Sequence, residues 1–200
     1  MGYKETYNRW LTSDVVDDDT KAELKSIENN EKEIEERFYR ELEFGTAGMR
    51  GIIGAGTNRI NIYNVRRASQ GVAKYVLSNG EDAAKAGVLI GYDTRNFSRT
   101  FAEETAKVLT CAGVKTYLFP IVHSVPEVSF GIRELGCSAG VMITASHNPK
   151  EYNGYKVPTA DNSLRTRLML LLPQSTATIY LTTLSLFRLT KQKKKACLKS

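Results

Sequence analysis

One short segment places three chemistry-bearing side chains next to one another. Ser146, His147 and Asn148 follow the largely apolar run 140–144 after a single alanine, and Pro149 comes after them. A serine that leaves a buried strand on a short, rigid loop stands clear of the sheet, which is the position that a covalently modified side chain requires. The spacing alone fits equally well a Ser/Asn helix cap followed by a proline turn.

Two further loops could meet this serine. The segment 45–51 reads GTAGMRG, and the segment 91–95 reads GYDTR directly after a short apolar run. In open α/β sheets, ligands bind beyond the carboxyl ends of the strands, where loops converge and helix N-termini point N–H groups at the ligand. We therefore expect the three loops to lie at, or to feed, one such edge of a sheet.

The elements that must position these loops alternate along the chain. Apolar residues at helical spacing predict helices over residues 20–43, from a cap at Asn64 to Asn79, from a cap at Ser98 to Gly113, and from about 126 to 136. Short apolar runs predict strands over residues 88–90, 114–119 and 140–144. Strand–helix–strand units of this length form right-handed parallel crossovers. The sequence thus predicts an α/β fold, a three-layer α/β/α domain with a mostly parallel sheet.

Other catalytic and binding patterns are missing from the sequence. The segment 54–56 (GAG) lacks the third glycine of a dinucleotide fingerprint, and no P-loop, Ser-His-Asp order or metal-ligand cluster occurs. The three cysteines have no spacing pattern, which indicates reduced thiols in the cytosol rather than a zinc site. The first 30 residues are polar and acidic, so no secretory signal is expected, and we predict a cytoplasmic protein.

The net charge of +6 belongs to one end of the chain. Residues 1–157 carry 20 Lys and Arg against 21 Asp and Glu, whereas residues 158–200 carry 8 against 1. All 15 glycines lie at or before Gly154. We therefore predict an N-terminal helical extension (1–40), an α/β/α domain (41–157) and an unrelated basic Leu/Thr-rich tail (158–200). The tail is either a genuine appendage or, as we favour, an out-of-frame read-through.

The tail does not predict a membrane or nucleic-acid partner. Residues 168–187 carry no charge and are long enough to span a membrane, but eight Pro, Gln, Ser and Thr residues dilute the run. The lysines near the C-terminus lack the interleaved aromatic residues of a nucleic-acid-binding segment. A membrane-attached form that uses the tail stays open as a rival hypothesis.

Four segments carry a resemblance to a known family. Segment 144–149, continued by EYNGYK at 151–156, resembles the phosphoserine signature of the α-D-phosphohexomutase superfamily, the phosphoglucomutases and phosphomannomutases. Segment 44–51 (FGTAGMRG) resembles the family's first active-site loop, and segment 91–98 resembles a later part of its first domain. The Glu-rich helix with NRIN at 58–61 is similar to the branch of phosphoglucomutases and phosphopentomutases. The resemblance covers residues 10–157 and implies an incomplete first domain of a four-domain enzyme.

The resemblance implies a reaction centred on Ser146. This serine would be phosphorylated and would exchange its phosphoryl group with a sugar through a sugar bisphosphate intermediate. A phosphoserine oxygen would ligate Mg²⁺, and glucose 1,6-bisphosphate would act as the activator. The small-molecule partner would be a phosphosugar, converted between hexose 1-phosphate and hexose 6-phosphate, with glucose favoured over mannose or a pentose. The oligomeric state is left open.

The resemblance also implies which residues surround the phosphoserine. Arg50 would be the cation beside the phosphate, and the glycine-rich loop would line the same pocket. His147 and Lys156 are candidates for proton handling or phosphate contact, against the alternatives of a backbone-bonded loop histidine and a solvated surface lysine. The expected catalytic residues are Ser146, His147, Arg50 and Lys156, and the expected phosphate-binding residues are Thr46, Gly48, Arg50, Asn148 and Lys156.

Two expectations concern what this chain does by itself. The family's metal loop, sugar-recognition loop and distal phosphate-binding domain come from later sequence, so we expect this chain alone to be inactive as a mutase. The alternative is a non-catalytic remnant that binds a phosphosugar without converting it. For Asp93 and Arg95, we favour an intradomain ion pair that fixes their loop.

Overall fold

The computed structural model describes residues 2–45 and 48–158, and within them six strands form one sheet in the order β1-β2-β6-β5-β3-β4. Strand β3 pairs in parallel with β4 and β5, whereas β6 runs antiparallel between β5 and β2, and β1 is antiparallel to β2. Strands β2, β3, β4 and β5 therefore point the same way, which confirms the expected α/β fold with a mostly parallel sheet. The strands are β1 (Phe44–Gly45), β2 (Gly48–Ile52), β3 (Val88–Tyr92), β4 (Thr116–Leu118), β5 (Ala139–Ile143) and β6 (Tyr152–Lys156).

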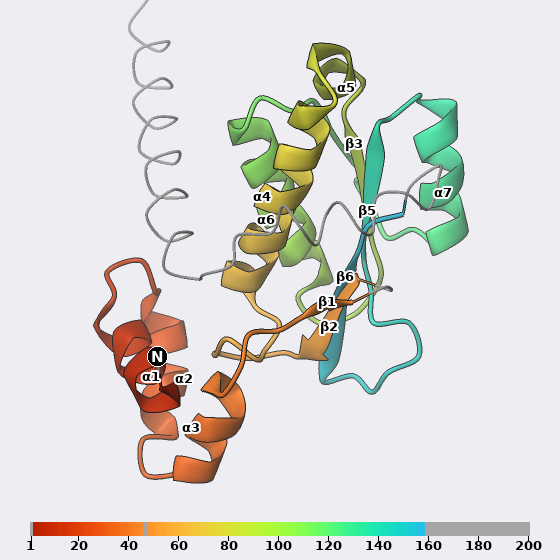
Figure 1. The fold of residues 1–200 in the computed structure, drawn as a ribbon. Coiled ribbons are helices and arrows are strands. Elements are labelled where there is room, and N and C mark those ends of the chain that lie inside the picture. The colour runs from red at the N-terminus through yellow and green to blue at the C-terminus, as the bar shows by residue number, and fades with distance from the viewer. Residues whose placement is uncertain (1, 46–47, 159–200) are drawn as a thin grey trace, which may run out of the picture.

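Helices cover both faces of this sheet (Figure 1). Helices α4 (Ile62–Ser78) and α6 (Ser98–Cys111) pack together on one face, where Ile90 and Val141 join their apolar side chains. Helix α7 (Val125–Glu134) covers the other face, over Leu89 and Met142. Because successive strand side chains point to opposite faces, β3 and β5 are buried throughout, as their continuous apolar sequences predict. A short helix, α5 (Glu81–Ala86), leads from α4 into β3.

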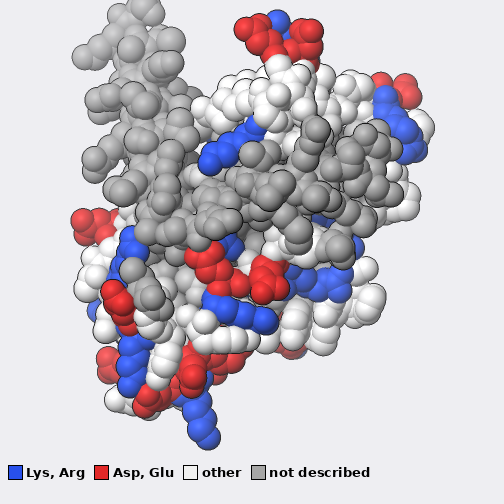
Figure 2. Space-filling model, in the orientation of Figure 1, with Lys and Arg blue, Asp and Glu red and all other residues white. Residues whose placement is uncertain are grey.

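Three helices at the N-terminus form a separate apolar cluster, α1 (Tyr3–Thr12), α2 (Asp18–Ser26) and α3 (Glu31–Phe38). The Trp10 ring lies edge-on to Phe38 at 5.6 Å and to Tyr63 at 5.1 Å between ring centroids, which ties the cluster to α4. Figure 2 shows acidic and basic side chains interspersed over this part of the molecule, where Glu23 and Glu33 form ion pairs with Arg37.

The prediction of one helix over residues 20–43 is wrong, because the chain there forms two helices with a second cap at Asn30, and the second helix ends at Phe38. Asp17 accepts a hydrogen bond from the Thr20 N–H at 2.8 Å and begins α2, and Asn30 accepts one from the Glu33 N–H at 3.2 Å and begins α3. Side-chain oxygens at these positions satisfy N–H groups that a helix start leaves unpaired. Helix α1 lies within the predicted N-terminal helical extension, but no apolar pattern predicted its bounds.

Two predicted helix caps are also wrong. Helix α4 begins after Asn61, which accepts from the Asn64 N–H, so Asn64 lies inside the helix. The cap position of α6 is Phe97, at a left-handed φ of 62°, and Ser98 is the first helical residue. The Ser98 hydroxyl instead donates to Asp93 at 2.7 Å.

Within residues 2–45 and 48–158, the structure contains no helix that is both long and apolar enough to cross a membrane. The uncharged run 168–187, the lysine-rich end and nearly all of the predicted tail lie outside the described residues.

Candidate functional site

The loop after β5 presents Ser146 at the surface. Thr144 and Ala145 are buried at the end of the strand, whereas Ser146 and His147 are exposed. The Ser146 backbone has a left-handed φ of 61°, which costs a residue with a Cβ roughly 1–2 kcal/mol. The Ser146 N–H donates to the Thr144 hydroxyl at 3.0 Å. The loop thus holds the serine hydroxyl clear of the sheet in a conformation that the surrounding contacts must maintain.

Strand β6 brings the glycine-rich segment to this loop. Strand β6 lies between β5 and β2, and its pairing with β2 places Gly154 opposite Arg50. The Arg50 guanidinium donates to the Asn148 side-chain oxygen at 2.6 Å, although the two residues are 98 positions apart in the sequence. Arg50 therefore contacts the segment 144–152, which we call the serine loop, at Asn148, close to Ser146 in the chain.

Lys156 lies on the same face of the sheet as Arg50. It is two residues beyond Gly154 on β6, and alternation along a strand returns the side chain to that face. Burial lowers the pKa of the Lys156 amine, the positive charge of Arg50 lowers it further, and Asp93 opposes the shift. Two cationic side chains close enough to repel one another form a site that an anion would stabilise.

Two glycines allow the strands at this site to approach closely. Gly48 has a φ of +95°, and a Cβ there would lie 2.2 Å from the Tyr155 carbonyl oxygen. A Cβ at Gly154 would lie 2.6 Å from the carbonyl oxygen of Thr144 and 3.0 Å from that of Met49. Gly48 therefore begins β2 in close contact with the backbone of β6. Thr46, which was expected in the same loop, lies outside the described residues.

Asp93 and Arg95 form the expected ion pair, with 3.5 Å between Arg95 Nε and Asp93 Oδ2. Arg95 also reaches the serine loop, where it donates hydrogen bonds to four backbone carbonyls, and these contacts were not predicted. No sequence pattern signals such contacts, because every residue carries a carbonyl. The one available signal was the position of Arg95 just past the carboxyl end of β3, the edge where ligands bind.

The described residues do not form a metal cage around Ser146. Across residues 2–45 and 48–158, no group of three or more His, Cys, Asp or Glu side chains is arranged to hold a metal ion. Asp93, which follows the neighbouring strand β3, is already engaged by Arg95 and Ser98. The carboxylates that Mg²⁺ prefers are therefore not supplied by the part of the chain that the structure describes.

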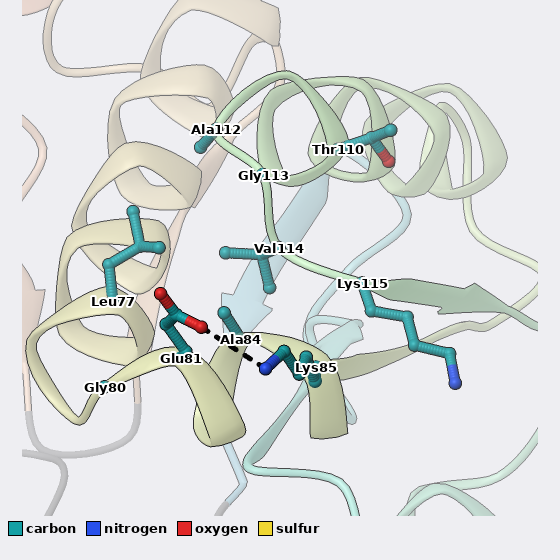
Figure 3. Close-up of a pocket in the computed structure, with 10 residues that line it drawn as sticks. All are labelled: Leu77, Gly80, Glu81, Ala84, Lys85, Thr110, Ala112, Gly113, Val114 and Lys115. Carbon is teal, nitrogen blue, oxygen red and sulfur yellow. Dashed lines mark hydrogen bonds and ion pairs between the residues drawn. The ribbon is translucent and has the colours of Figure 1, made fainter.

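A pocket of about 820 Å³ lies at the other end of the sheet (Figure 3). Its walls come from the end of α4, from α5 and from the connection between α6 and β4, with Lys85 and Glu81 paired at 3.3 Å. This pocket adjoins the starts of β3 and β4, whereas Ser146 follows the end of β5. The two sites are therefore separate.

Comparison with known proteins agrees with this geometry. The family described as phosphoglucomutase/phosphomannomutase, alpha/beta/alpha domain I, matches residues 41–166. A Schizosaccharomyces pombe protein assigned as a phosphoribomutase is 44% identical over 156 residues, which are 77% of this chain and 26% of that protein. A phosphoglucomutase of Staphylococcus haemolyticus is 46% identical over 129 residues, 64% of this chain and 23% of that protein.

A solved structure shows the same fold. A Thermus thermophilus protein assigned as a phosphomannomutase superposes with a TM-score of 0.59 and 29% identity, over 67% of this chain and 30% of that one. The chain spans about a quarter of the length of the curated relatives it matches. The chain belongs to the phosphoglucomutase/phosphomannomutase family and corresponds to its α/β/α domain I.

Proposed function

We propose that this chain is the phosphoserine-bearing domain of a phosphosugar mutase and that Ser146 is its phosphoryl carrier. The observation that carries the proposal is the exposed Ser146 on a left-handed loop, with Arg50 and Lys156 on the neighbouring strands. A phosphoryl carrier must be accessible to substrate, fixed in position and close to positive charge. The relatives named phosphoglucomutase and phosphoribomutase support the same reaction class.

The proposed chemistry consists of two phosphoryl transfers in opposite directions. In the first, the bond between phosphorus and Ser146 Oγ breaks and that oxygen takes up a proton, while a sugar phosphate hydroxyl forms a new bond to the same phosphorus and loses its proton. The sugar bisphosphate then turns over. In the second, Ser146 Oγ loses its proton and bonds to the phosphorus of the other phosphoryl group, and the bond from that phosphorus to the sugar oxygen breaks, which leaves a sugar hydroxyl. Arg50 and Lys156 would offset negative charge on the group in transit, and Asn148 would keep Arg50 in place.

The proton of the attacking hydroxyl needs an acceptor. Lys156 is a candidate, because its lowered pKa makes the neutral amine more accessible than in an ordinary lysine. His147 is the second candidate, since it is exposed directly beside Ser146 and its ring can either accept a proton or contact phosphate. Gly48 and Thr46 are proposed to line the phosphate pocket from the first loop.

The proposed substrates are glucose 1-phosphate and glucose 6-phosphate, with glucose 1,6-bisphosphate as activator, because several relatives carry the name phosphoglucomutase. A pentose phosphate is the second candidate, favoured by the relative assigned as a phosphoribomutase. We also propose Mg²⁺ as the metal, which would neutralise phosphoryl charge when bound. Within the described residues, the oxygen of phosphorylated Ser146 is the ligand we assign to it. A cytoplasmic location fits such metabolites.

Phosphorylation of the purified chain tests the proposal. We expect glucose 1,6-bisphosphate to transfer one phosphoryl group, located on Ser146 by peptide mass spectrometry, and we expect Ser146→Ala to abolish the transfer. Ser26→Ala, at an exposed serine that ends α2, is the matched control and should be phosphorylated like the wild type. Failure of the wild-type chain to acquire phosphate on Ser146 would overturn the proposal.

Two additional readouts separate the alternatives. Phosphosugar binding without phosphate on Ser146 would instead identify a non-catalytic binding domain. One transfer to Ser146 does not require the bisphosphate to turn over in the site, whereas repeated conversion does, and the family's sugar-recognition loop is expected from later sequence. In a coupled assay for glucose 6-phosphate, the chain with Mg²⁺ and glucose 1,6-bisphosphate is therefore expected to show no repeated turnover above background, and turnover at an ordinary enzymatic rate would contradict that expectation. Faster phosphorylation by a pentose bisphosphate would reassign the substrate.

A further inference from the structure

The guanidinium of Arg95 lies among four backbone carbonyls of the serine loop. Its Nη2 donates to the carbonyl oxygens of Ser146 at 2.9 Å and Asn148 at 2.6 Å. Its Nη1 donates to those of Pro149 at 2.9 Å and Tyr152 at 3.1 Å. The loop between β5 and β6 is therefore closed around one side chain that comes from a different crossover of the sheet.

Asp93 holds that side chain in place from behind. The Arg95 Nε lies 3.5 Å from Asp93 Oδ2, and the two side chains are only 15% and 24% exposed. The other Asp93 oxygen accepts from the Ser98 hydroxyl and from the Arg95 N–H. Asn153, which follows the loop, donates to Ser98 at 2.9 Å. The carboxylate, the guanidinium and the loop thus form one connected network with the start of α6.

We infer that Arg95 is a positioning residue, which fixes the left-handed conformation of Ser146 and thereby the site of its hydroxyl. The Ser146 carbonyl accepts from Arg95 on one side of the strained residue, and its N–H donates to Thr144 on the other. Without the guanidinium, four carbonyl oxygens that face one point would repel one another, and the loop would relax. The catalytic consequence rests on the proposed phosphorylation of Ser146.

An arginine suits this position and a lysine does not. Guanidinium is a planar fork with five N–H donors, so it can serve several carbonyls and a carboxylate at once. An ammonium group has three donors at one point and cannot span carbonyls that lie on both sides of the loop. Arg95→Lys therefore keeps the charge while it removes most of the loop contacts, which makes it the informative variant.

The test compares Arg95→Lys with Arg99→Lys, a matched change four residues later at a side chain that is 72% exposed and pairs with Glu103. We expect Arg95→Lys to slow phosphorylation of Ser146 by glucose 1,6-bisphosphate about 10- to 100-fold at saturation. The half-saturating concentration should change by less than about threefold, because Arg50 and Lys156 remain. Arg99→Lys should match the wild type in the rate at saturation and in the half-saturating concentration.

Hydrogen exchange gives a readout that does not depend on phosphorylation. Arg95→Lys should speed exchange of the Ser146 and Asn148 amides about tenfold or more, and leave the amide of Ile90 in β3 unchanged. If Arg95→Lys exchanges faster but even the wild-type chain acquires no phosphate, the proposed function is wrong and the positioning role stands. If folded Arg95→Lys exchanges the serine-loop amides at the same rate as the wild type, the positioning role is wrong.

A second variant covers the case in which Arg95→Lys does not fold. Asp93→Asn removes the charge behind Arg95 and keeps an oxygen for the Ser98 hydroxyl. We expect a smaller slowing of Ser146 phosphorylation, about threefold to tenfold, with faster exchange of the same two amides. Phosphorylation and exchange at wild-type rates in this variant would overturn the inference.

Discussion

The Arg50 side chain on β2 donates a 2.6 Å hydrogen bond to the side-chain oxygen of Asn148 in the loop after β5. This bond joins two segments that are 98 residues apart and are brought together by β6, which pairs with both strands. Arginine has five N–H donors, so the bond to Asn148 uses only part of its capacity. The same side chain can fix the loop and still face an anion.

Asn148→Asp should therefore slow the proposed phosphorylation of Ser146. The substitution keeps an oxygen for Arg50 and adds a negative charge close to the serine, which repels the incoming phosphoryl group. We expect the rate with glucose 1,6-bisphosphate to fall about tenfold. Asn29→Asp, at an exposed turn residue, is the matched control and should leave the rate unchanged. An unchanged rate in Asn148→Asp would mean that phosphate does not pass near this residue.

Gly154→Ala should destabilise the sheet. The added Cβ would meet the carbonyl oxygens of Thr144 and Met49, both backbone atoms of neighbouring segments that cannot turn away. Overpacking of this kind costs about 1–3 kcal/mol, measured as the free energy of unfolding in urea. Gly2→Ala has no heavy atom within 4 Å and is expected to be nearly neutral. Equal unfolding midpoints for the two variants would contradict the close packing of β6.

The raised pKa of Tyr63 predicts a loss of stability at high pH. Burial and then a 2.5 Å hydrogen bond to Asp17 raise the pKa of Tyr63 to about 12. The folded chain therefore retains a proton that the unfolded chain releases near pH 10, so stability falls as the pH rises from about 10 to 12. We expect the wild type to lose up to about 3 kcal/mol more than Tyr63→Phe over this window.

Tyr39→Phe is the matched control for that experiment, because Tyr39 is an exposed tyrosine at the end of α3. Its alkaline unfolding curve should follow that of the wild type. Near pH 7, Tyr63→Phe itself should be less stable than the wild type by about 1–2 kcal/mol, since it leaves one Asp17 oxygen without its hydrogen-bond donor. Parallel alkaline curves for the wild type and Tyr63→Phe would contradict the raised pKa.

The parallel half of the fold was predictable because its signals are local. The runs at 88–90 and 140–144 are apolar at nearly every position, which is typical of strands buried on both faces. Strands β2 (GMRGI) and β6 (YNGYK) have no such pattern, because their pairing depends on glycines that admit neighbouring backbones. Which asparagine begins α4 was equally open to error, since Asn61 and Asn64 are both good caps.

The site was predictable in its residue types and only partly in its connections. Resemblance to the family directed attention to Ser146, Arg50 and Lys156, and the sheet order places their segments side by side. The roles assigned to these residues, and the domain boundary at residue 157, stay predictions. The contacts of Arg95 could not be read from the sequence, because its acceptors are carbonyl oxygens and its reach depends on how two loops converge.

Lys156→Met should make the chain more stable while it weakens the response to phosphate. Burial and Arg50 lower the pKa of Lys156, so the protonated amine is disfavoured in the folded state. Wild-type stability should therefore rise with pH toward the ordinary lysine pKa of about 10.4, a rise that the methionine variant lacks. Near pH 7 we expect Lys156→Met to gain up to about 1 kcal/mol in the free energy of unfolding.

The response to inorganic phosphate tests whether Lys156 helps to bind an anion or only destabilises the folded chain. Binding to the folded state raises the melting temperature, so phosphate should stabilise the wild type more than Lys156→Met if Arg50 and Lys156 together attract the anion. Lys25→Met, at an exposed lysine on α2, controls for the loss of one positive charge and should respond to phosphate like the wild type. Removal of the charge repulsion should raise the free energy of unfolding. A lower stability of Lys156→Met at pH 7 would therefore show that packing contacts of the Lys156 side chain outweigh its repulsion by Arg50. An equal phosphate response in all three chains would place the anion site elsewhere.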